Sequence, residues 1–192
     1  MRKRLKFLLL AFCVMIIGAC DNMDNETDIA FIGDSLIARW DLETYFPVCK
    51  TQNLGLIGSG IEWLEQHQST LIEQTAVVLT GTNDLKHLDE ISIDDYACQY
   101  IDAVIGLGAK KIILISILPK NSKSDSPNIN QLIMKLNQSI AAKVDDEKKI
   151  EYCDVYSAFL KEGTLNMNLS YDGIHLNQYG YEILARNIKS HL

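Results

Sequence analysis

Short apolar runs alternate along this sequence with longer stretches in which apolar residues recur every three or four positions. Uninterrupted apolar runs are typical of strands buried on both faces, as in a parallel sheet, whereas the longer period is typical of helices. The pattern predicts strands at 29–32, 48–54 (the weakest), 76–80, 111–117 and 150–155. It predicts helices within 61–72, 92–105, 129–144 and 179–188.

The order of these elements predicts the fold class. Strands that alternate with helices form right-handed βαβ crossovers, which place helices on both faces of a parallel sheet. We therefore expect a three-layer α/β fold with about five parallel strands. We find no internal repeat and no sign of a second domain, so residues 29–192 are predicted to form one domain.

Chemically active residues follow several of the predicted strands. Ligands of such sheets bind outside the carboxyl ends of the strands, so these residues are expected to meet at one edge. The segments are Gly33-Asp34-Ser35, 53–60, Gly81-Thr82-Asn83-Asp84 and, after a further loop, Asp172-Gly173-Ile174-His175. Together they offer a hydroxyl, an imidazole, a carboxylate and an amide, which are the groups that acyl transfer by a serine nucleophile requires.

The same segments carry a family resemblance. In order, and at suitable spacing, they match the four landmark motifs of the SGNH hydrolases, also called GDSL esterases and lipases, with the second motif read as Asn53-x-Gly55-x-x-Gly58. The sequence resembles this family over nearly all of residues 29–192. The resemblance implies a flavodoxin-like sheet and a reaction that needs no metal or organic cofactor.

The resemblance also implies roles for single residues. Ser35 corresponds to the nucleophile, His175 to its base and Asp172 to the residue that orients the base. The oxyanion hole would be formed by the backbone N–H groups of Ser35 and Gly58 and by the side chain of Asn83. Trp40 and Gly180-Tyr181 resemble packing positions of the family. The sequence departs from the common pattern at Ser59-Gly60 and at Leu176, which affects the substrate pocket rather than the catalytic atoms.

Other residues compete for the roles of base and nucleophile. Asp84 and His87 repeat the D-x-x-H spacing of Asp172 and His175, and spacing alone does not choose between the two pairs. Ser59 is a rival nucleophile, although its surroundings lack the G-x-S-x-G pattern of the other large esterase class. No pair of histidines has the i, i+4 spacing of metal ligands.

Two classes of function fit these residues. The first is a serine esterase, for which short acyl or acetyl groups on carbohydrate or cell-envelope glycan are favoured, because the chain has little spare length for a lid or a long acyl tunnel. A lysophospholipase or thioesterase acting on longer acyl chains is the alternative. The second class is a non-catalytic glycan- or lipid-binding surface lipoprotein, which would be expected to lack a triad member or Asn83.

The N-terminus predicts export. Four cationic residues at 2–6 precede an apolar run at 8–17, which is typical of a secretory signal. The following Ile17-Gly18-Ala19-Cys20 resembles a bacterial lipobox. We therefore predict a signal peptide at 1–19, lipidation of Cys20 and a flexible tether at 20–28, with the protein anchored to a membrane of the bacterial cell envelope. An ordinary signal peptide with a chance cysteine is the alternative.

Charge and cysteine usage narrow the possible partners. The formal net charge of the 192 residues is −7, and loss of residues 1–19 would remove four cationic and no acidic side chains. This excess of acidic residues argues against nucleic-acid binding. Cys49, Cys98 and Cys153 include no CxxC pair, so we expect buried thiols. One disulfide between two of them, with the third cysteine free, is the alternative. We expect a monomer that binds a small-molecule or glycan ester.

Overall fold

The computed structural model describes residues 28–88, 92–145 and 147–192, apart from the side chain of His87. The predicted signal peptide, the lipidation site Cys20 and nearly all of the tether lie outside these residues. The centre of the fold is a five-stranded parallel sheet of order β2-β1-β3-β4-β5, which confirms the predicted fold class. Its strands are β1 (Ile29–Gly33), β2 (Thr51–Gly55), β3 (Thr75–Leu79), β4 (Lys111–Ile115) and β5 (Ile150–Cys153).

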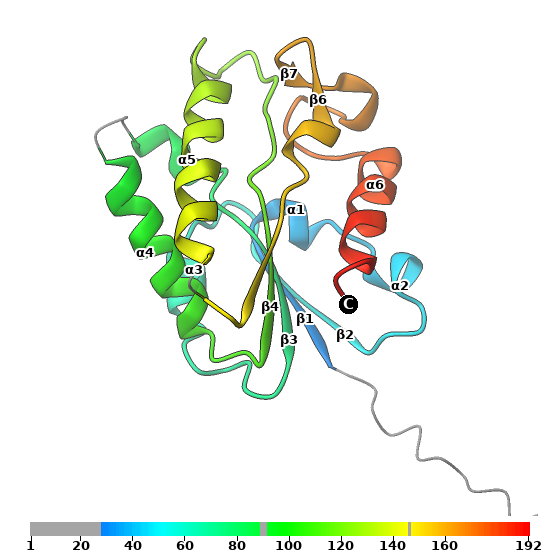
Figure 1. The fold of residues 1–192 in the computed structure, drawn as a ribbon. Helices are drawn as coiled ribbons and strands as arrows, with labels where there is room; N and C mark the ends of the chain where they lie inside the picture. The colour runs from blue at the N-terminus through cyan, green and yellow to red at the C-terminus, as the bar shows by residue number, and fades with distance from the viewer. Residues whose placement is uncertain (1–27, 89–91, 146) are drawn as a thin grey trace, which may run out of the picture.

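Helices cover both faces of this sheet (Figure 1). One layer consists of α3 (Glu62–Glu65), α4 (Ile93–Gly106) and α5 (Ile129–Val144), and the other of α1 (Ser35–Ala38), α2 (Leu42–Tyr45) and α6 (Gln178–Lys189). Successive strand residues point to opposite faces. In β1, for example, Ala30 and Ile32 pack toward α4 and α5, whereas Ile29 and Phe31 pack toward α6. The sheet therefore separates two apolar cores.

The predicted helix within 61–72 is largely wrong. Only α3 (Glu62–Glu65) forms there, and Ile72, which ends the predicted segment, is exposed. Ser69 and Glu73 both adopt positive φ angles, 57° and 63°, which a right-handed helix does not contain. The N–H of Ser69 instead donates to the carbonyl of Gly106, at 2.7 Å, so tertiary contacts override the local pattern.

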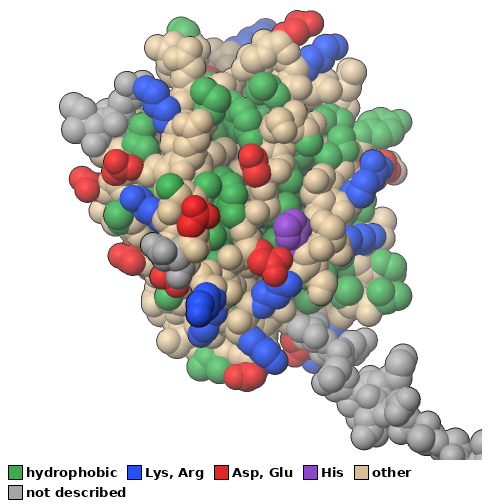
Figure 2. All heavy atoms as spheres, viewed as in Figure 1, with side chains coloured by type: hydrophobic (Ala, Val, Ile, Leu, Met, Phe, Trp, Pro, Cys, Tyr) green, Lys and Arg blue, Asp and Glu red, His purple; other side chains and the backbone are tan. Residues whose placement is uncertain are grey.

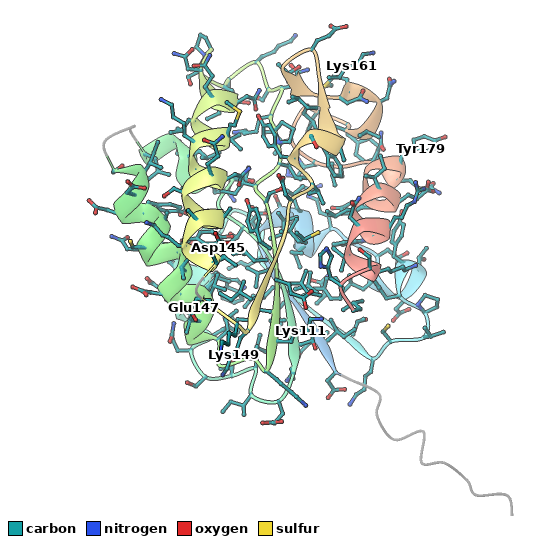
Figure 3. All side chains as sticks on the ribbon, viewed as in Figure 1. Lys111, Asp145, Glu147, Lys149, Lys161 and Tyr179 are labelled. Carbon is teal, nitrogen blue, oxygen red and sulfur yellow. The ribbon has the colours of Figure 1, made fainter. Side chains whose placement is uncertain are left out.

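The chain after β5 carries most of the small elements. These are η2 (Tyr156–Phe159), the hairpin of β6 (Leu160–Lys161) and β7 (Thr164–Leu165), and η3 (Met167–Leu169). Another short 3-10 helix, η1 (Asp84–His87), follows β3. In Figure 3, Lys111 marks the amino end of β4, and Lys161 marks the opposite end of the molecule, toward which the carboxyl ends of the strands point. The region after β5 therefore overhangs that edge of the sheet.

An aromatic cluster fastens α6 to the segment around α1. The rings of Trp40 and Tyr181 stack with centroids 5.4 Å apart, and Phe31 meets Trp40 edge-on at 5.4 Å. The buried hydroxyl of Tyr181 donates to the carbonyl of Leu36 at 2.8 Å. On its other side α6 lies close to η3, which Gly180 allows because a Cβ there would lie 2.5 Å from the carbonyl oxygen of Leu169. These contacts fix the C-terminal part of the chain against the residues that follow β1.

The expectation of buried thiols is correct for one cysteine and wrong for another. Cys153 is buried in β5, Cys49 is partly buried, and Cys98 is exposed on α4, where the apolar stripe faces away from it. All three are free thiols, so the disulfide that the sequence left open does not form among them.

Two observations concern the surface. Cationic and anionic side chains are interspersed over the face shown in Figure 2, with apolar side chains between them. Among the helices of the described residues, none combines the length and the hydropathy needed to cross a bilayer.

Candidate active site

The nucleophile candidate Ser35 is positioned by the carboxyl end of β1. Gly33 ends the strand where no side chain fits, since a Cβ would lie 1.8 Å from the carbonyl oxygen of Leu79. Asp34 then caps α1, with its Oδ1 accepting from the N–H of Leu36 at 2.9 Å. Ser35 is the first residue of that helix, and only 7 % of its surface is exposed. The turn from strand to helix thus leaves its hydroxyl at the sheet edge.

The structure brings Ser35, His175 and Asp172 into one hydrogen-bonded chain. Ser35 Oγ lies 3.1 Å from His175 Nε2, and His175 Nδ1 lies 2.7 Å from Asp172 Oδ2. The other carboxylate oxygen, Oδ1, accepts from the backbone N–H groups of His175 at 2.8 Å and Ile174 at 3.0 Å. In the tautomer in which Nδ1 carries the proton, Nε2 is free to accept the hydroxyl proton of Ser35.

Hydrogen bonding keeps the Asp172 carboxylate ionised. Burial by itself would raise the pKa of this group, but the bonds from the His175 ring and from the N–H groups of His175 and Ile174 outweigh it and lower the pKa to about 2. The side chain is half-exposed, so water screens part of this effect. The carboxylate beside Nδ1 therefore holds the His175 ring in place and in the tautomer that leaves Nε2 free.

A serine that the sequence analysis did not single out holds the loop of the base. The hydroxyl of Ser170 donates to the carbonyl of His175 at 2.7 Å and accepts from the N–H groups of Gly173 at 2.9 Å and Asp172 at 3.3 Å. Ser170 is buried, and its backbone forms an isolated antiparallel bridge with Leu176. Only its position, two residues before Asp172, could have indicated this role from the sequence.

Gly173 is needed at the tip of this loop for two reasons. Its φ is +86°, which residues with a side chain rarely adopt, and a Cβ would lie 2.1 Å from the carbonyl oxygen of Asn121. The carbonyl of Gly173 in turn accepts from the N–H of Asn121 at 2.8 Å. The segment after β4 therefore supports the loop that carries His175.

The predicted oxyanion residues lie in the loops after β2 and β3. Asn83 Nδ2 donates to the carbonyl of Ser59 at 2.8 Å, which fixes the amide and uses one of its two N–H groups. Gly58 is exposed and has a φ of +83°. The rival nucleophile Ser59 is buried, and its hydroxyl bonds to the backbone carbonyls of Leu56 at 2.8 Å and Gly33 at 3.4 Å. Ser59 thus stabilises the loop.

The rival carboxylate Asp84 faces a different part of this edge. Its Oδ1 accepts from the N–H of Ile61 at 3.4 Å, and the carboxylate lies where a Cβ on Gly60 would clash with it. Burial raises the pKa of Asp84, although the Tyr96 hydroxyl favours the charged form. The side chain of the predicted rival base His87 lies outside the described residues, so the Asp84 and His87 pair stays a matter for experiment.

A second carboxylate, Asp34, lies directly beside the nucleophile. Burial raises the pKa of Asp34 to about 7, even though the N–H of Leu36 and the neighbouring Thr82 favour the charged form, and the nearby Asp84 adds to the rise. Asp34 is fully buried and caps α1, so its carboxyl group supports the turn before Ser35 rather than facing the pocket.

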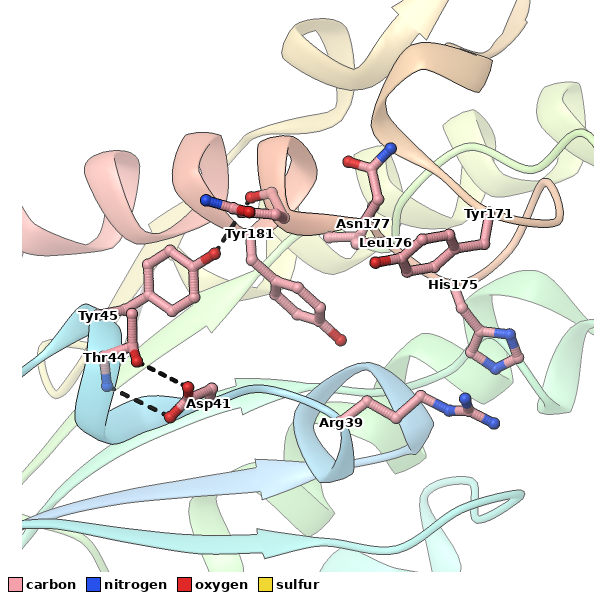
Figure 4. Close-up of a pocket in the computed structure, with 10 residues that line it drawn as sticks. Arg39, Asp41, Thr44, Tyr45, Tyr171, His175, Leu176, Asn177 and Tyr181 are labelled. Carbon is pink, nitrogen blue, oxygen red and sulfur yellow. Dashed lines mark hydrogen bonds between the residues drawn. The ribbon is translucent and has the colours of Figure 1, made fainter.

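A pocket of about 440 Å³ opens beside His175 (Figure 4). It lies between the segment after α1 and the start of α6. The residues that line it are Arg39, Asp41, Thr44, Tyr45, Tyr171, His175, Leu176, Asn177, Gln178 and Tyr181. Arg39 and Tyr171 are functional candidates that the sequence analysis missed, because neither stands in a motif. Leu176, noted there as a departure from the family pattern, is part of this wall.

No metal site accompanies this arrangement within the described residues, where no three His, Cys, Asp or Glu side chains gather closely enough to hold an ion. The groups that the structure gathers at this edge are a hydroxyl, an imidazole, a carboxylate and an amide.

Comparison with known proteins places the chain in a family. Residues 31–183 match the model of the GDSL-like lipase/acylhydrolase family. Over 183 residues, the chain is 31 % identical to an N-acylneuraminate cytidylyltransferase of Escherichia coli O18:K1:H7, covering 88 % of this chain but 41 % of that protein. Over 188 residues it is 26 % identical to human platelet-activating factor acetylhydrolase IB subunit alpha1, covering 88 % of this chain and 77 % of the relative. The chain thus spans less than half of the first relative and about three quarters of the second.

Solved structures show the same fold. A GDSL-like lipase from Bacteroides thetaiotaomicron superposes with a TM-score of 0.71 at 23 % identity, covering 86 % of this chain and 87 % of that one. A catalytic mutant of an acetylxylan esterase from Geobacillus stearothermophilus gives a TM-score of 0.65 at 17 % identity, covering 85 % and 93 %. The solved structures thus share the fold, and the match over residues 31–183 shows that the chain belongs to the GDSL-like lipase/acylhydrolase family.

Proposed function

We propose that this protein is a serine esterase that removes short acyl or acetyl groups from carbohydrate. The observation that carries the proposal is the hydrogen-bonded chain from Ser35 Oγ through His175 to Asp172, with links of 3.1 and 2.7 Å. A hydroxyl with no base beside it is a weak nucleophile, and this chain supplies both the base and the carboxylate that orients it.

The reaction would proceed in two steps. Ser35 Oγ gives its proton to His175 Nε2 and attacks the ester carbonyl carbon, while the backbone N–H groups of Ser35 and Gly58 and the Asn83 amide stabilise the oxyanion. His175 then gives the proton to the leaving alcohol oxygen as the ester C–O bond breaks, which leaves an acyl group on Ser35. A water molecule, deprotonated by His175, releases the acid and restores the enzyme, with Asp172 ionised throughout.

Three findings support short acyl groups on sugars. The human relative is named an acetylhydrolase, and one structural neighbour is an acetylxylan esterase. The pocket beside His175 is lined mainly by polar and tyrosine side chains, which suits a hydroxylated alcohol group better than a lipid.

One observation favours longer acyl chains as the second candidate. Leu56 and Ile57, which precede Gly58 in the loop after β2, are 44 % and 63 % exposed. An apolar surface beside an oxyanion donor could contact the first carbons of an acyl chain. A lysophospholipid or thioester substrate would use this surface, whereas an acetyl group is too short to reach far along it.

Two measurements test the proposed function. The purified full chain is expected to hydrolyse p-nitrophenyl acetate, and Ser35→Ala is expected to abolish the turnover. Retained turnover in Ser35→Ala would remove Ser35 as the nucleophile, and no turnover by the unsubstituted protein would favour a non-catalytic binder of glycan or lipid. A series of p-nitrophenyl esters from acetate to palmitate then separates the two substrate classes, since the carbohydrate esterase should lose activity steadily beyond the shortest chains.

We further propose that the protein is a lipoprotein of the bacterial cell envelope, anchored through Cys20. The support is the cationic start, the apolar run at 8–17 and the small residues before Cys20. The intact mass of protein extracted from bacterial membranes should begin at Cys20 and include a lipid adduct. Cys20→Ser should remove the adduct, and an unmodified soluble chain that begins elsewhere would contradict the proposal.

A further inference from the structure

The pocket beside His175 lies on the side of the alcohol part of the ester. This step rests on the proposed function, in which His175 Nε2 passes a proton to the leaving oxygen, so that oxygen must lie next to the imidazole. His175 lines the pocket, whereas none of the proposed oxyanion donors, Ser35, Gly58 and Asn83, does. The group that extends from the leaving oxygen into the pocket is therefore the alcohol and not the acyl chain.

Arg39 gives this pocket an unpaired positive charge. It follows α1 and is exposed, and in Figure 4 its guanidinium group extends toward the side of the pocket where His175 lies. Arg39 is the only lysine or arginine among the lining residues, and within the described residues no carboxylate lies at ion-pairing distance from it. A free guanidinium fork matches the geometry of a carboxylate better than that of a neutral hydroxyl.

The nearby carboxylates are engaged elsewhere. Asp41 caps α2, accepting from the N–H and hydroxyl of Thr44 at 3.3 and 2.7 Å. Asp172 accepts from His175 and from backbone N–H groups. Arg39 is therefore the side chain of this wall that can bind an anion directly.

The remaining walls suit a sugar ring. Tyr171 is 76 % exposed at the mouth of the pocket, and Tyr45 lies across from it, as Figure 4 shows. Aromatic faces are electron-rich and pack against the C–H groups of sugar rings, while their hydroxyl groups remain available for hydrogen bonds. We propose that the alcohol part of the substrate is a sugar acid, whose carboxylate binds the guanidinium group of Arg39 while its ring packs against Tyr171.

The experiment compares two esters that differ only in charge. Monoacetylated methyl glucuronosides, acetylated at each ring hydroxyl in turn, are assayed beside the corresponding glucuronamides, in which an amide replaces the carboxylate. For at least one acetyl position, kcat/KM is expected to be about ten- to a hundredfold higher for the acid than for the amide, as a charge-assisted bidentate contact predicts. In Arg39→Gln this ratio should fall to near one. Because the ratio is taken within one variant, it does not depend on the overall activity of that variant.

A matched variant controls for net charge. Arg186, on the outer side of α6, is exposed and does not line the pocket, so Arg186→Gln removes the same charge and should keep the preference of the unsubstituted protein. Equal rates on acid and amide, or a preference that survives Arg39→Gln, would overturn the proposal while p-nitrophenyl acetate is still hydrolysed. Absence of turnover on p-nitrophenyl acetate would instead overturn the proposed esterase function on which it rests.

Discussion

The nucleophile and its base are held in different ways. Ser35 is placed by the sheet, since it follows β1, which is paired on both sides, after one buried capping residue and has almost no exposed surface. His175 lies on a loop outside the sheet, which depends on Ser170, on Asn121 and on the packing of α6. The comparison indicates that the sheet fixes one half of the site and that local hydrogen bonds fix the other half.

The two halves also shift the pKa of their carboxyl groups in opposite directions. Asp34 on the Ser35 side is buried, which raises its pKa to about 7, whereas hydrogen bonds on the His175 side lower the pKa of Asp172 to about 2. Asp34 therefore supports the turn before Ser35 through its hydrogen bond to Leu36, but its charged form lowers the stability of the fold. The half-exposed group keeps a charge that the reaction can use.

The largest effect is expected from removing the base. His175→Ala should lower kcat on p-nitrophenyl acetate by about 10⁴-fold or more, nearly as much as Ser35→Ala, because the hydroxyl then has no proton acceptor. The double variant should be little worse than either single one, since the residues act as a unit. Steady-state kinetics with circular dichroism as a folding control provide the measurement.

The matched control for that variant is His87→Ala, which tests the rival D-x-x-H pair. Activity within a few-fold of the unsubstituted protein is expected. If His87→Ala abolished activity and His175→Ala spared it, the roles assigned to Asp172 and His175 would pass to Asp84 and His87.

The next effect concerns the oxyanion side. Asn83→Ala should lower kcat by about 10²–10³-fold, which is the usual result of losing one oxyanion donor. Because Nδ2 also bonds to the carbonyl of Ser59 at 2.8 Å, a small loss of stability is expected as well. Thermal melts beside the kinetics separate the two effects. Unchanged kcat with a lower Tm would show that Asn83 only stabilises the loop.

The sequence predicted the sheet half of this comparison well. The five predicted strands correspond to β1 to β5 within a few residues at each end. Continuous apolar runs marked the strands buried in the sheet, whereas the edge strand β2 is polar and partly exposed and was the weakest prediction. Because strand ends gather at one edge, the motif positions of Ser35 and Asn83 also followed from the pattern. The prediction of a helix within 61–72 failed because tertiary contacts, such as the hydrogen bond from Ser69 to Gly106, determine the turns of this segment.

The loop half could be predicted only where a motif marked it. Asp172 and His175 stand in a recognisable segment, whereas Ser170 and Arg39 have no pattern that distinguishes them from ordinary polar surface residues. Their importance comes from contacts across the fold, such as the pocket that Arg39 shares with residues at the start of α6. No periodicity along the chain carries that information.

A smaller effect is expected at Ser170. Ser170→Ala removes three hydrogen bonds from the loop of the base and should lower kcat by about ten- to a hundredfold, because a small displacement of His175 weakens its contact with Ser35. The matched control is Ser116→Ala, a buried serine whose hydroxyl accepts from the N–H of Val155 at 3.0 Å. Both variants should lower Tm, but only Ser170→Ala should lower kcat. Equal activity in the two would contradict a positioning role.

The smallest effect on activity is expected at Asp34, where the change appears in stability. Asn can keep the cap on the N–H of Leu36 but carries no charge. Since the folded pKa of Asp34 is raised to about 7, its contribution to stability is fully present below the unfolded pKa near 4 and is lost as the pH rises through 7. Asp34→Asn should therefore gain stability relative to the unsubstituted protein between pH 4 and pH 8, by on the order of 2–4 kcal/mol at the upper end.

Denaturant unfolding at several pH values checks this expectation, and Asp172→Asn shows that the two halves of the site differ. The pKa of Asp172 is lowered, so its contribution is present above pH 4 and is lost as the pH falls toward 2, the opposite sign in a separate window. The stability difference between Asp34→Asn and the unsubstituted protein should thus grow with pH only above 4. A difference that stayed constant from pH 4 to pH 8 would mean that Asp34 is ionised in the fold at pH 4, and that burial does not govern the nucleophile side of the site.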